Sequence, residues 1–143
     1  MHISSLLAQK GSTVATVVAE ATVADALAEL ERHGIGALVV SADGAHIDGI
    51  LSERDVVRAF GHMGGELLGH PVSSIMTTDV VTVSPDDEVD SLMATMTDHR
   101  VRHVPVVAEG QLCGLVSIGD VVKSRIVELE KDRKELVEYI TAR

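Results

Sequence analysis

Hydrophobic and polar positions along this chain follow a strand pattern and then a helix pattern, and this order occurs twice. β-Branched runs at residues 14–18 and 80–83 have the length and composition of short strands. Apolar residues in 22–33 recur at the spacing of one helix face, and Gly34 follows as a stop signal. The same helical spacing returns from residue 89. The pattern therefore predicts a strand followed by a helix in each half of the chain.

A hairpin pattern follows each predicted helix. Two apolar runs flank Asp43 and the glycine after it, and two more flank Glu109 and its glycine. Pro105 cannot donate to a β-ladder, so we expect it at a strand start or a sheet edge. Further helices are predicted to begin at Ser52 and Ser117. Each half thus reads strand, helix, strand, strand, helix.

The two halves are copies of one another. His33 aligns with His99 at an offset of 66 residues, and Gly49 aligns with Gly114 at an offset of 65. One extra residue in the first hairpin accounts for the change. Internal repetition of this kind predicts one α/β (α+β) fold built from two tandem units.

The divisions of the chain follow from this duplication. We expect residues 1–60 to form the first repeat with a short N-terminal helix, and residues 71–126 to form the second. The Gly-rich segment 61–70, which is followed by proline, has the composition of a linker. Residues 127–143 are predicted to extend the last helix.

That C-terminal helix carries a narrow apolar seam among many charged residues. The seam consists of Ile126, Leu129, Leu136 and Ile140. A charged helix with such a stripe packs on a neighbour or on its own symmetry mate. We therefore expect a homodimer, with docking on its own domain as the alternative.

Composition narrows the classes of function. The chain has 143 residues, 45% of them apolar, and a net charge of −10, which weighs against binding to nucleic-acid backbones. Phe60 and Tyr139 are the only aromatic residues, too few for base-stacking platforms. No apolar run is long enough to span a membrane, and the N-terminus lacks the pattern of a secretory signal. With Cys113 as the single cysteine, a reducing cytoplasmic location is expected.

Two tandem copies of this unit, each ending in Gly-h-h-Ser-x-x-Asp (h, apolar), resemble the cystathionine-β-synthase-type (CBS) domain pair, or Bateman module. The motifs are "GILSERD" and "GLVSIGD", with "RVRHVPVV" ahead of the second hairpin. The resemblance covers residues 10–125. It implies two repeats packed about a pseudo-two-fold axis, with two clefts between them that bind adenosine compounds. AMP is the first expectation, with NAD or ATP as alternatives.

The resemblance also implies roles for individual residues. Asp55 and Asp120 would accept hydrogen bonds from ribose hydroxyls, and the hydroxyls of Ser52 and Ser117 would approach a phosphate. The segment before each first strand would line the adenine: Lys10, Gly11, Thr13 and Ala15 in copy one, and Met76, Thr77, Asp79 and Val81 in copy two. The pseudo-symmetry implies that each aspartate faces the base-lining segment of the other copy.

The copies differ in their basic residues. Copy two has Arg100, Arg102 and His103 where copy one has Gly34, Gly36 and Ala37, and copy one has Arg54 where copy two has Gly119. A phosphate explains such cations in an acidic chain, since arginine donates a planar fork to it. We expect Arg54 to serve the phosphate of one cleft and Arg102 with His103 that of the other. Arg58 is expected on the surface.

Ser-x-x-Asp before an apolar helix is also the signal of a capping box. In a cap the carboxylate accepts from a backbone N–H, which stabilises a helix by ~1 kcal/mol. A ribose site instead needs carboxylate oxygens free to accept from a vicinal diol. The isolated tetrapeptide favours the cap, whereas its duplication within the family pattern favours the site. The helix N-terminus would in addition favour a nearby phosphate.

No catalytic or metal-ligating set is recognisable. His99 and His103 are separated by a helix-to-strand turn, and no zinc-binding motif accompanies them, so no metal site is expected. Cys113 is predicted in a core strand, and neither Ser52 nor Ser117 has a histidine in register as a base. We therefore expect no enzyme. The hypothesis is a regulatory sensor of energy or redox state with an unidentified protein partner, and the alternative is a structural interaction module without nucleotide binding.

Overall fold

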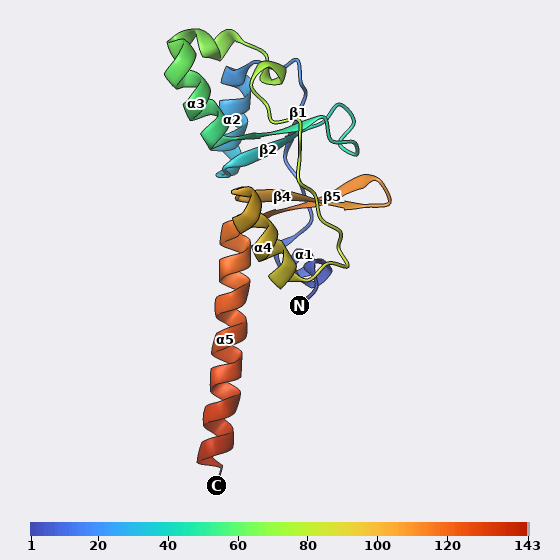
Figure 1. Cartoon of the computed structure of the whole chain (residues 1–143), viewed down its shortest axis with the longest axis vertical. Helices are drawn as coiled ribbons and strands as arrows, with labels where there is room; N and C mark the ends of the chain where they lie inside the picture. The colour runs from blue at the N-terminus through green and yellow to red at the C-terminus, as the bar shows by residue number, and fades with distance from the viewer. Residues whose placement is uncertain (143) are drawn as a thin grey trace.

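A computed structural model describes residues 1–142, which form two similar halves placed one above the other, with a long helix extending from the lower half (Figure 1). The first repeat comprises β1 (Thr16–Val17), α2 (Val23–His33), β2 (Ala37–Val40), β3 (Gly49–Ser52) and α3 (Glu53–Met63). The second comprises α4 (Val89–His99), β4 (His103–Ala108), β5 (Gln111–Ser117) and α5 (Ile118–Thr141). Helix α1 (Ile3–Lys10) precedes both. The mixed α/β fold of two tandem repeats is confirmed.

Local signals in the sequence explain where the helices of the first repeat begin and end. The Thr22 side chain accepts a hydrogen bond from the N–H of Asp25 at 3.1 Å and caps α2. Gly34 ends α2 in the left-handed conformation, with φ 62°. Buried Val23, Ala26 and Leu30 lie on one face of the helix and belong to the same hydrophobic core as the buried residues of β2 and β3. The helical spacing in the sequence thus becomes a buried stripe.

The two sheets are unequal. In the first repeat β1 pairs parallel with β2, and β2 pairs antiparallel with β3. In the second, β4 and β5 form a two-stranded antiparallel sheet. The strand predicted at residues 80–83 is reduced to one parallel bridge between Val83 and Val106.

Pro105 explains the missing strand. In the first repeat the N–H of Val39 donates to the carbonyl of Ala15, and this bond helps to define β1. The residue that aligns with Val39 in the second repeat is Pro105, which has no N–H to offer Val81. Only the bonds on either side of Val83 remain. The expectation of a full strand at 80–83 is therefore wrong, and the proline is the physical reason.

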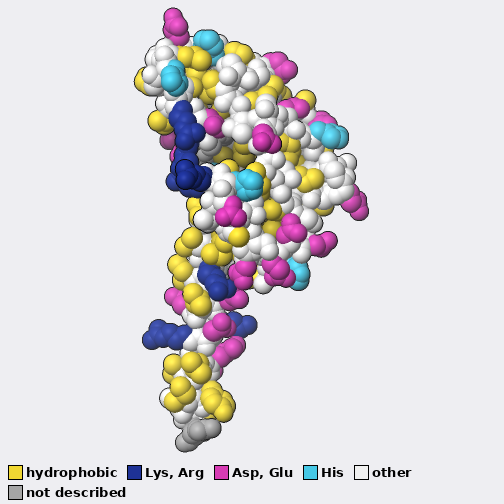
Figure 2. Space-filling model, in the orientation of Figure 1, with side chains coloured by type: hydrophobic (Ala, Val, Ile, Leu, Met, Phe, Trp, Pro, Cys, Tyr) yellow, Lys and Arg dark blue, Asp and Glu magenta, His cyan; other side chains and the backbone are white. Residues whose placement is uncertain are grey.

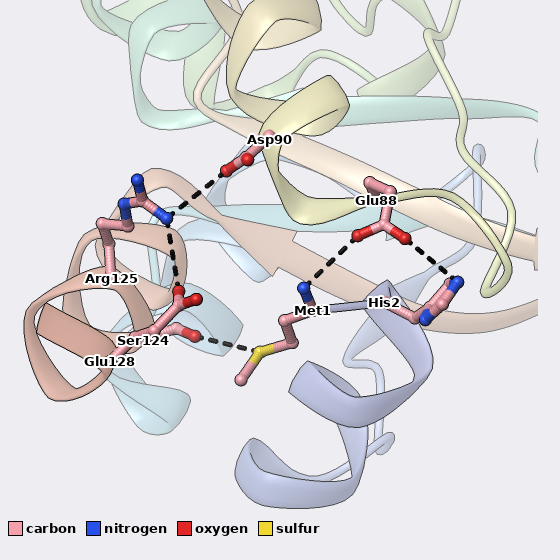
Figure 3. Close-up of polar contacts among 7 residues, drawn as sticks. All are labelled: Met1, His2, Glu88, Asp90, Ser124, Arg125 and Glu128. Atoms are coloured by element: carbon pink, nitrogen blue, oxygen red, sulfur yellow. Dashed lines mark hydrogen bonds and ion pairs between the residues drawn. The ribbon is translucent and has the colours of Figure 1, made fainter. Parts of the chain in front are cut away.

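Each repeat has its own hydrophobic core, but α1 belongs to the core of the second. Ile3, Leu6 and Leu7 of α1 pack with Leu92 and Val116, although α1 lies before the first repeat in the chain. Around them the N-terminus is held by polar contacts to α4 and α5 (Figure 3). Glu88 pairs with the Met1 amine at 3.3 Å and with His2 at 3.1 Å, and the Ser124 hydroxyl of α5 donates to the Met1 sulfur at 3.2 Å. Arg125 of α5 lies 3.7 Å from Asp90 of α4 and so connects the two helices.

The segment expected as a linker has regular structure. Helix α3 extends into it as far as Met63, and the 3-10 helices η1 (Gly64–Gly69) and η2 (Val72–Ser74) follow. Leu67 and Val72 are completely buried in the core of the first repeat. This glycine-rich segment is therefore a connection between the repeats that packs into the core of the first.

Helix α5 is continuous from the second repeat into its C-terminal part and ends at Thr141; the last residue of the extension expected at 127–143 lies outside the described residues. Val121 and Ser124 near its start are buried, whereas the seam residues farther along are at least half exposed. Figure 1 shows that this part of the helix extends away from both repeats.

Candidate functional site

A cleft between the repeats lies at the start of α3. It has a volume of about 390 Å³, and we call it the Asp55 cleft. The first repeat contributes Ser52, Arg54, Asp55 and Arg58, and the second contributes Thr77, Asp79, Val81, Arg100, Arg102 and His103. Asp55 therefore faces the pre-strand segment of the other repeat.

A related cleft lies at the start of α5. It has a volume of about 640 Å³, and we call it the Asp120 cleft. The second repeat contributes Ser117, Asp120 and His103, and the first contributes Lys10, Thr13, Ala15, Glu29, Arg32, Gly34 and Gly36. In both clefts the Ser-x-x-Asp motif of one repeat thus lies with the segment before the first strand of the other repeat, an arrangement that we call the exchange of segments.

Backbone hydrogen bonds hold the exchanged segment of the Asp55 cleft. Ile50 of β3 and Thr77 bond to each other in both directions, each at 2.9 Å. Gly49 permits this approach, because a Cβ there would lie 2.8 Å from both the Thr77 carbonyl oxygen and the Met76 sulfur. Thr77 is consequently positioned by the sheet of the first repeat.

Both Ser-x-x-Asp motifs form complete capping boxes. In the first, the Asp55 N–H donates to Ser52 Oγ at 3.3 Å, and Asp55 Oδ2 accepts from the Ser52 N–H at 2.9 Å. The second box, between Ser117 and Asp120, has the same form. The cap uses only Oδ2 of each carboxylate. Capping and ligand binding are therefore compatible, although the sequence presented them as alternatives.

The other oxygen of each aspartate differs in its surroundings. Asp55 Oδ1 accepts from Thr77 Oγ1 in a long contact of 3.3 Å. Within residues 1–142, Asp120 Oδ1 has no hydrogen-bond partner. Each cleft therefore retains carboxylate capacity for a hydroxyl ligand.

Lys10 neutralises Asp120 in the second cleft. Its ammonium nitrogen lies 2.6 Å from Asp120 Oδ2 and also donates to the Leu115 carbonyl. Burial raises the pKa of Asp120, but the hydrogen bonds from Lys10 and Ser117 and the Lys10 charge outweigh it, so that its pKa is lowered. Asp120 is therefore ionised and already paired at neutral pH.

His103 lies between the clefts. It lines both of them and also a hollow of about 540 Å³ that adjoins them. Burial and the neighbouring Arg102 charge lower its pKa, so that the imidazole is neutral at pH 7. Gly36 allows the ring to sit there, since a Cβ at Gly36 would lie 3.3 Å from His103 Cε1.

The structure places two of the expected lining residues elsewhere. Met76 packs, partly buried, against the core of the first repeat, and Gly11 is the exposed C-cap of α1. Neither is among the lining of the Asp55 or the Asp120 cleft.

The arginines are also distributed differently from the expectation. Arg102 lines the Asp55 cleft together with Arg54, and it also lines the adjoining hollow with Ser117 and Gly119. It is not in the lining of the Asp120 cleft, so the expected division of Arg54 and Arg102 between separate clefts does not hold. The pairing of the repeats brings the start of α3 next to the turn before β4, which sequence alignment of the copies does not reveal. Arg58 and Arg100 line the same cleft. Arg58 follows Arg54 by four residues on α3, and this helical spacing was the available signal.

The charges on the surface match this arrangement. Figure 2 shows one group of Lys and Arg side chains on the flank between the two halves, beside a hollow, and others along the protruding helix, while Asp and Glu are spread over the rest of that face. Within residues 1–142, the four arginines of the Asp55 cleft take part in no ion pair.

Metal-binding clusters and membrane-spanning helices are both absent from the described part of the chain. Among those residues, no group of three or more His, Cys, Asp or Glu side chains is placed to hold a metal ion. No helix within residues 1–142 has both the length and the apolar composition needed to cross a membrane.

Comparison with known proteins identifies the family. The family model described as "CBS domain" matches residues 11–62 and 72–127. The mitochondrial CBS domain-containing protein CBSX3 of Arabidopsis thaliana is 38% identical over 123 residues, which are 83% of this chain but only 60% of that relative.

Solved structures agree with this result. The CBS-domain containing protein ATU1752 from Agrobacterium tumefaciens is 44% identical with a TM-score of 0.84, covering 87% of this chain and 99% of that one. The CBS domain protein PAE2072 from Pyrobaculum aerophilum, complexed with AMP, is 30% identical with a TM-score of 0.78, covering 91% of this chain and 97% of that one. The repeated strand and helix pattern, the exchanged segments and these matches together show that the chain belongs to the CBS domain family, with two CBS domains in tandem.

Proposed function

We propose that this chain is a regulatory protein that binds adenine nucleotides in the clefts between its two CBS repeats. AMP, ATP and NAD are the candidate ligands, and the chain would report energy or redox state to a protein partner. The observation that carries the proposal is the exchange of segments, in which each Ser-x-x-Asp motif faces the pre-strand segment of the other repeat. The AMP complex of the 30% identical relative PAE2072 supports the same ligand class.

The chemistry of each cleft suits a nucleoside. A carboxylate with lone pairs to spare accepts from two ribose hydroxyls, and Thr77 or Thr13 lines the wall opposite the aspartate. In α3 the cap and the Gly36 carbonyl engage the N–H groups of Ser52, Glu53 and Asp55. The N–H of Arg54, the remaining donor of the first turn, can meet a phosphate.

Regulation follows from the position of the clefts. A ligand that contacts both repeats stabilises the arrangement in which they lie closest around it. It changes the protein only to the extent that it binds one arrangement more tightly than another. A partner that distinguishes these arrangements would then sense the ligand.

We also propose that the chain is a homodimer with α5 at the interface. Ile126, Leu129, Leu136 and Ile140 are each more than half exposed, on a helix that extends from the body of the protein. Leu136→Glu should convert the dimer to a monomer of 15.1 kDa, whereas Lys131→Glu on another face of α5 should leave it intact. Light scattering after size exclusion measures both masses, and a monomeric parent chain would overturn the proposal.

The exposed seam also supports a second candidate function, that of an interaction module without nucleotide binding. Thermal unfolding with and without ~1 mM AMP, ATP or NAD separates the two, as it detects ligand-induced stabilisation. Asp55→Asn and Asp120→Asn are suitable variants because an amide oxygen can still accept the capping hydrogen bond. We expect stabilisation of the parent chain and its loss in at least one variant. The absence of stabilisation with every nucleotide would favour the interaction module.

A further inference from the structure

Building on the proposed function, we infer that the two clefts bind different ligands. The Asp55 cleft is a site for a nucleotide with two or more phosphates, and the Asp120 cleft does not take such a ligand. One polyphosphate nucleotide therefore binds per chain. The inference goes beyond nucleotide binding because it assigns the number of phosphates and the cleft, and it is carried by the cations at positions related by the duplication.

The strand pairing fixes which positions are equivalent. Ala37 pairs with Ser52 in the first hairpin, and His103 pairs with Ser117 in the second. Counting from these pairs, Arg100 and Arg102 correspond to Gly34 and Gly36, while Arg54 and Arg58 correspond to Gly119 and Lys123. Three of the four arginines of the Asp55 cleft thus have a glycine as their counterpart.

The cations that the Asp120 cleft does possess are already paired. Lys10 lies 2.6 Å from Asp120, and Arg32 lies 2.8 Å from Glu29. In the Asp55 cleft, by contrast, none of the four arginines has an ion-pair partner within residues 1–142. Their guanidinium groups remain available to form charge-assisted hydrogen bonds with phosphate oxygens.

Arg100 provides a separate argument from the backbone. It is the C-cap of α4 with φ 54° and ψ 42°, nearly the conformation of Gly34 at the end of α2, with φ 62° and ψ 40°. The left-handed conformation is costly for a residue with a Cβ and free of that cost for glycine. The Arg100 side chain has no hydrogen bond or ion pair within residues 1–142 that would offset this cost. An arginine at a position suited to glycine indicates that its side chain serves function and not stability, and here the side chain lines a cleft.

The arginines also come from both sides of the cleft. Arg54 and Arg58 belong to α3 of the first repeat, whereas Arg100 and Arg102 belong to the turn before β4 of the second. A chain of phosphates can contact both pairs and connect the repeats, while a single phosphate offers fewer oxygens to share between them. Glu53, Asp55 and Asp79 line the same cleft, but within residues 1–142 none of them forms an ion pair with the four arginines. Affinity should therefore increase with each added phosphate, which brings new oxygens to guanidinium groups that a monophosphate leaves unpaired.

Isothermal titration of the full chain with adenosine, AMP, ADP and ATP tests this inference. The buffer contains EDTA, so that divalent cations do not screen the phosphates. We expect affinity to increase from AMP to ATP by about tenfold or more, the size of one added charge-assisted hydrogen bond, with one ATP bound per chain.

Arg100→Gly is the decisive variant because it should not unfold the protein. Glycine relieves the left-handed backbone, so the melting temperature should stay the same or rise. ATP affinity should fall about tenfold, with adenosine affinity almost unchanged. Arg32→Ala is the matched control, since it removes a guanidinium group from the Asp120 cleft and should leave ATP binding as it was.

Each outcome bears on a different claim. Equal affinity for AMP and ATP, two ATP molecules per chain, or loss of ATP binding in Arg32→Ala but not in Arg100→Gly would each overturn the inference and leave nucleotide binding intact. No binding of any of the four compounds would instead overturn the proposed function.

Discussion

Gly49→Ala is predicted to destabilise the protein at the junction of the two repeats. A Cβ at residue 49 would lie 2.8 Å from the Thr77 carbonyl oxygen and 2.8 Å from Met76 Sδ. The Met76 side chain can rotate away, but the Thr77 carbonyl accepts the Ile50 N–H at 2.9 Å and is fixed by it. The added methyl group must therefore separate β3 from the pre-strand segment of the second repeat.

The magnitude follows from these contacts. Overpacking by one carbon costs about 1–3 kcal/mol. Weakening the hydrogen bonds between Ile50 and Thr77 adds about 0.5–1.5 kcal/mol for each one lost. We expect a loss of about 2–4 kcal/mol in the free energy of unfolding. Gly114 is the matched position in the second repeat, where a Cβ would lie 2.7 Å from Cδ2 of Leu7. Since that contact is with a side chain rather than with the backbone, Gly114→Ala should cost less, about 1–2 kcal/mol.

Urea unfolding of the parent chain and both variants measures these differences. Because Thr77 lines the Asp55 cleft, Gly49→Ala should also weaken nucleotide binding, while Gly114→Ala should not. A smaller loss for Gly49→Ala than for Gly114→Ala would refute the argument that a fixed backbone carbonyl sets the cost.

Three further predictions concern single residues. Gly61 lies inside α3, and a Cβ added there would have open space within 4 Å, so Gly61→Ala should stabilise the protein by about 0.5–1 kcal/mol in urea unfolding, and a loss would contradict it. Lys10 helps to lower the pKa of Asp120, so the stability that this carboxylate contributes is present above pH 3.8 and is lost as the pH falls through its lower folded-state pKa. The difference in free energy of unfolding between the parent chain and Asp120→Asn should therefore be large at pH 7 and disappear in strong acid. The folded-state pKa of His103 is below 6.5, so acidification should destabilise the protein in the window just below pH 6.5. Proton NMR of the imidazole should give a titration midpoint below 6.5, and this midpoint should rise when ATP binds. A midpoint at the ordinary histidine value would refute the effect of burial.

The sequence predicted the elements of the fold well because they depend on local rules. These rules act within a few positions along the chain: the spacing of apolar residues, the turn residues, and the caps at Ser52 and Ser117. The duplication strengthened the prediction because the same signals occur in both copies. The missing strand at 80–83 also has a local cause, Pro105, but its effect falls on a segment more than twenty residues earlier in the chain. Only the parallel pairing in the structure shows which N–H the proline removes.

The site was harder to predict because it forms between the repeats. The aspartates and their facing segments followed from the resemblance, yet Arg102 was expected in the cleft opposite to the one it lines. Aligned residues of a duplicated chain lie in different clefts, so alignment alone cannot say which cations meet. Likewise α1 precedes the first repeat but completes the core of the second. Both differences arise from the way the two copies exchange segments.

A crystal structure of the protein grown with ATP tests the central claim most directly. The account predicts one nucleotide per chain in the Asp55 cleft, with ribose hydroxyls within hydrogen-bond distance of Asp55 and phosphates between the start of α3 and Arg102. Empty clefts at saturating ATP, or a nucleotide bound at a surface outside both clefts, would contradict it.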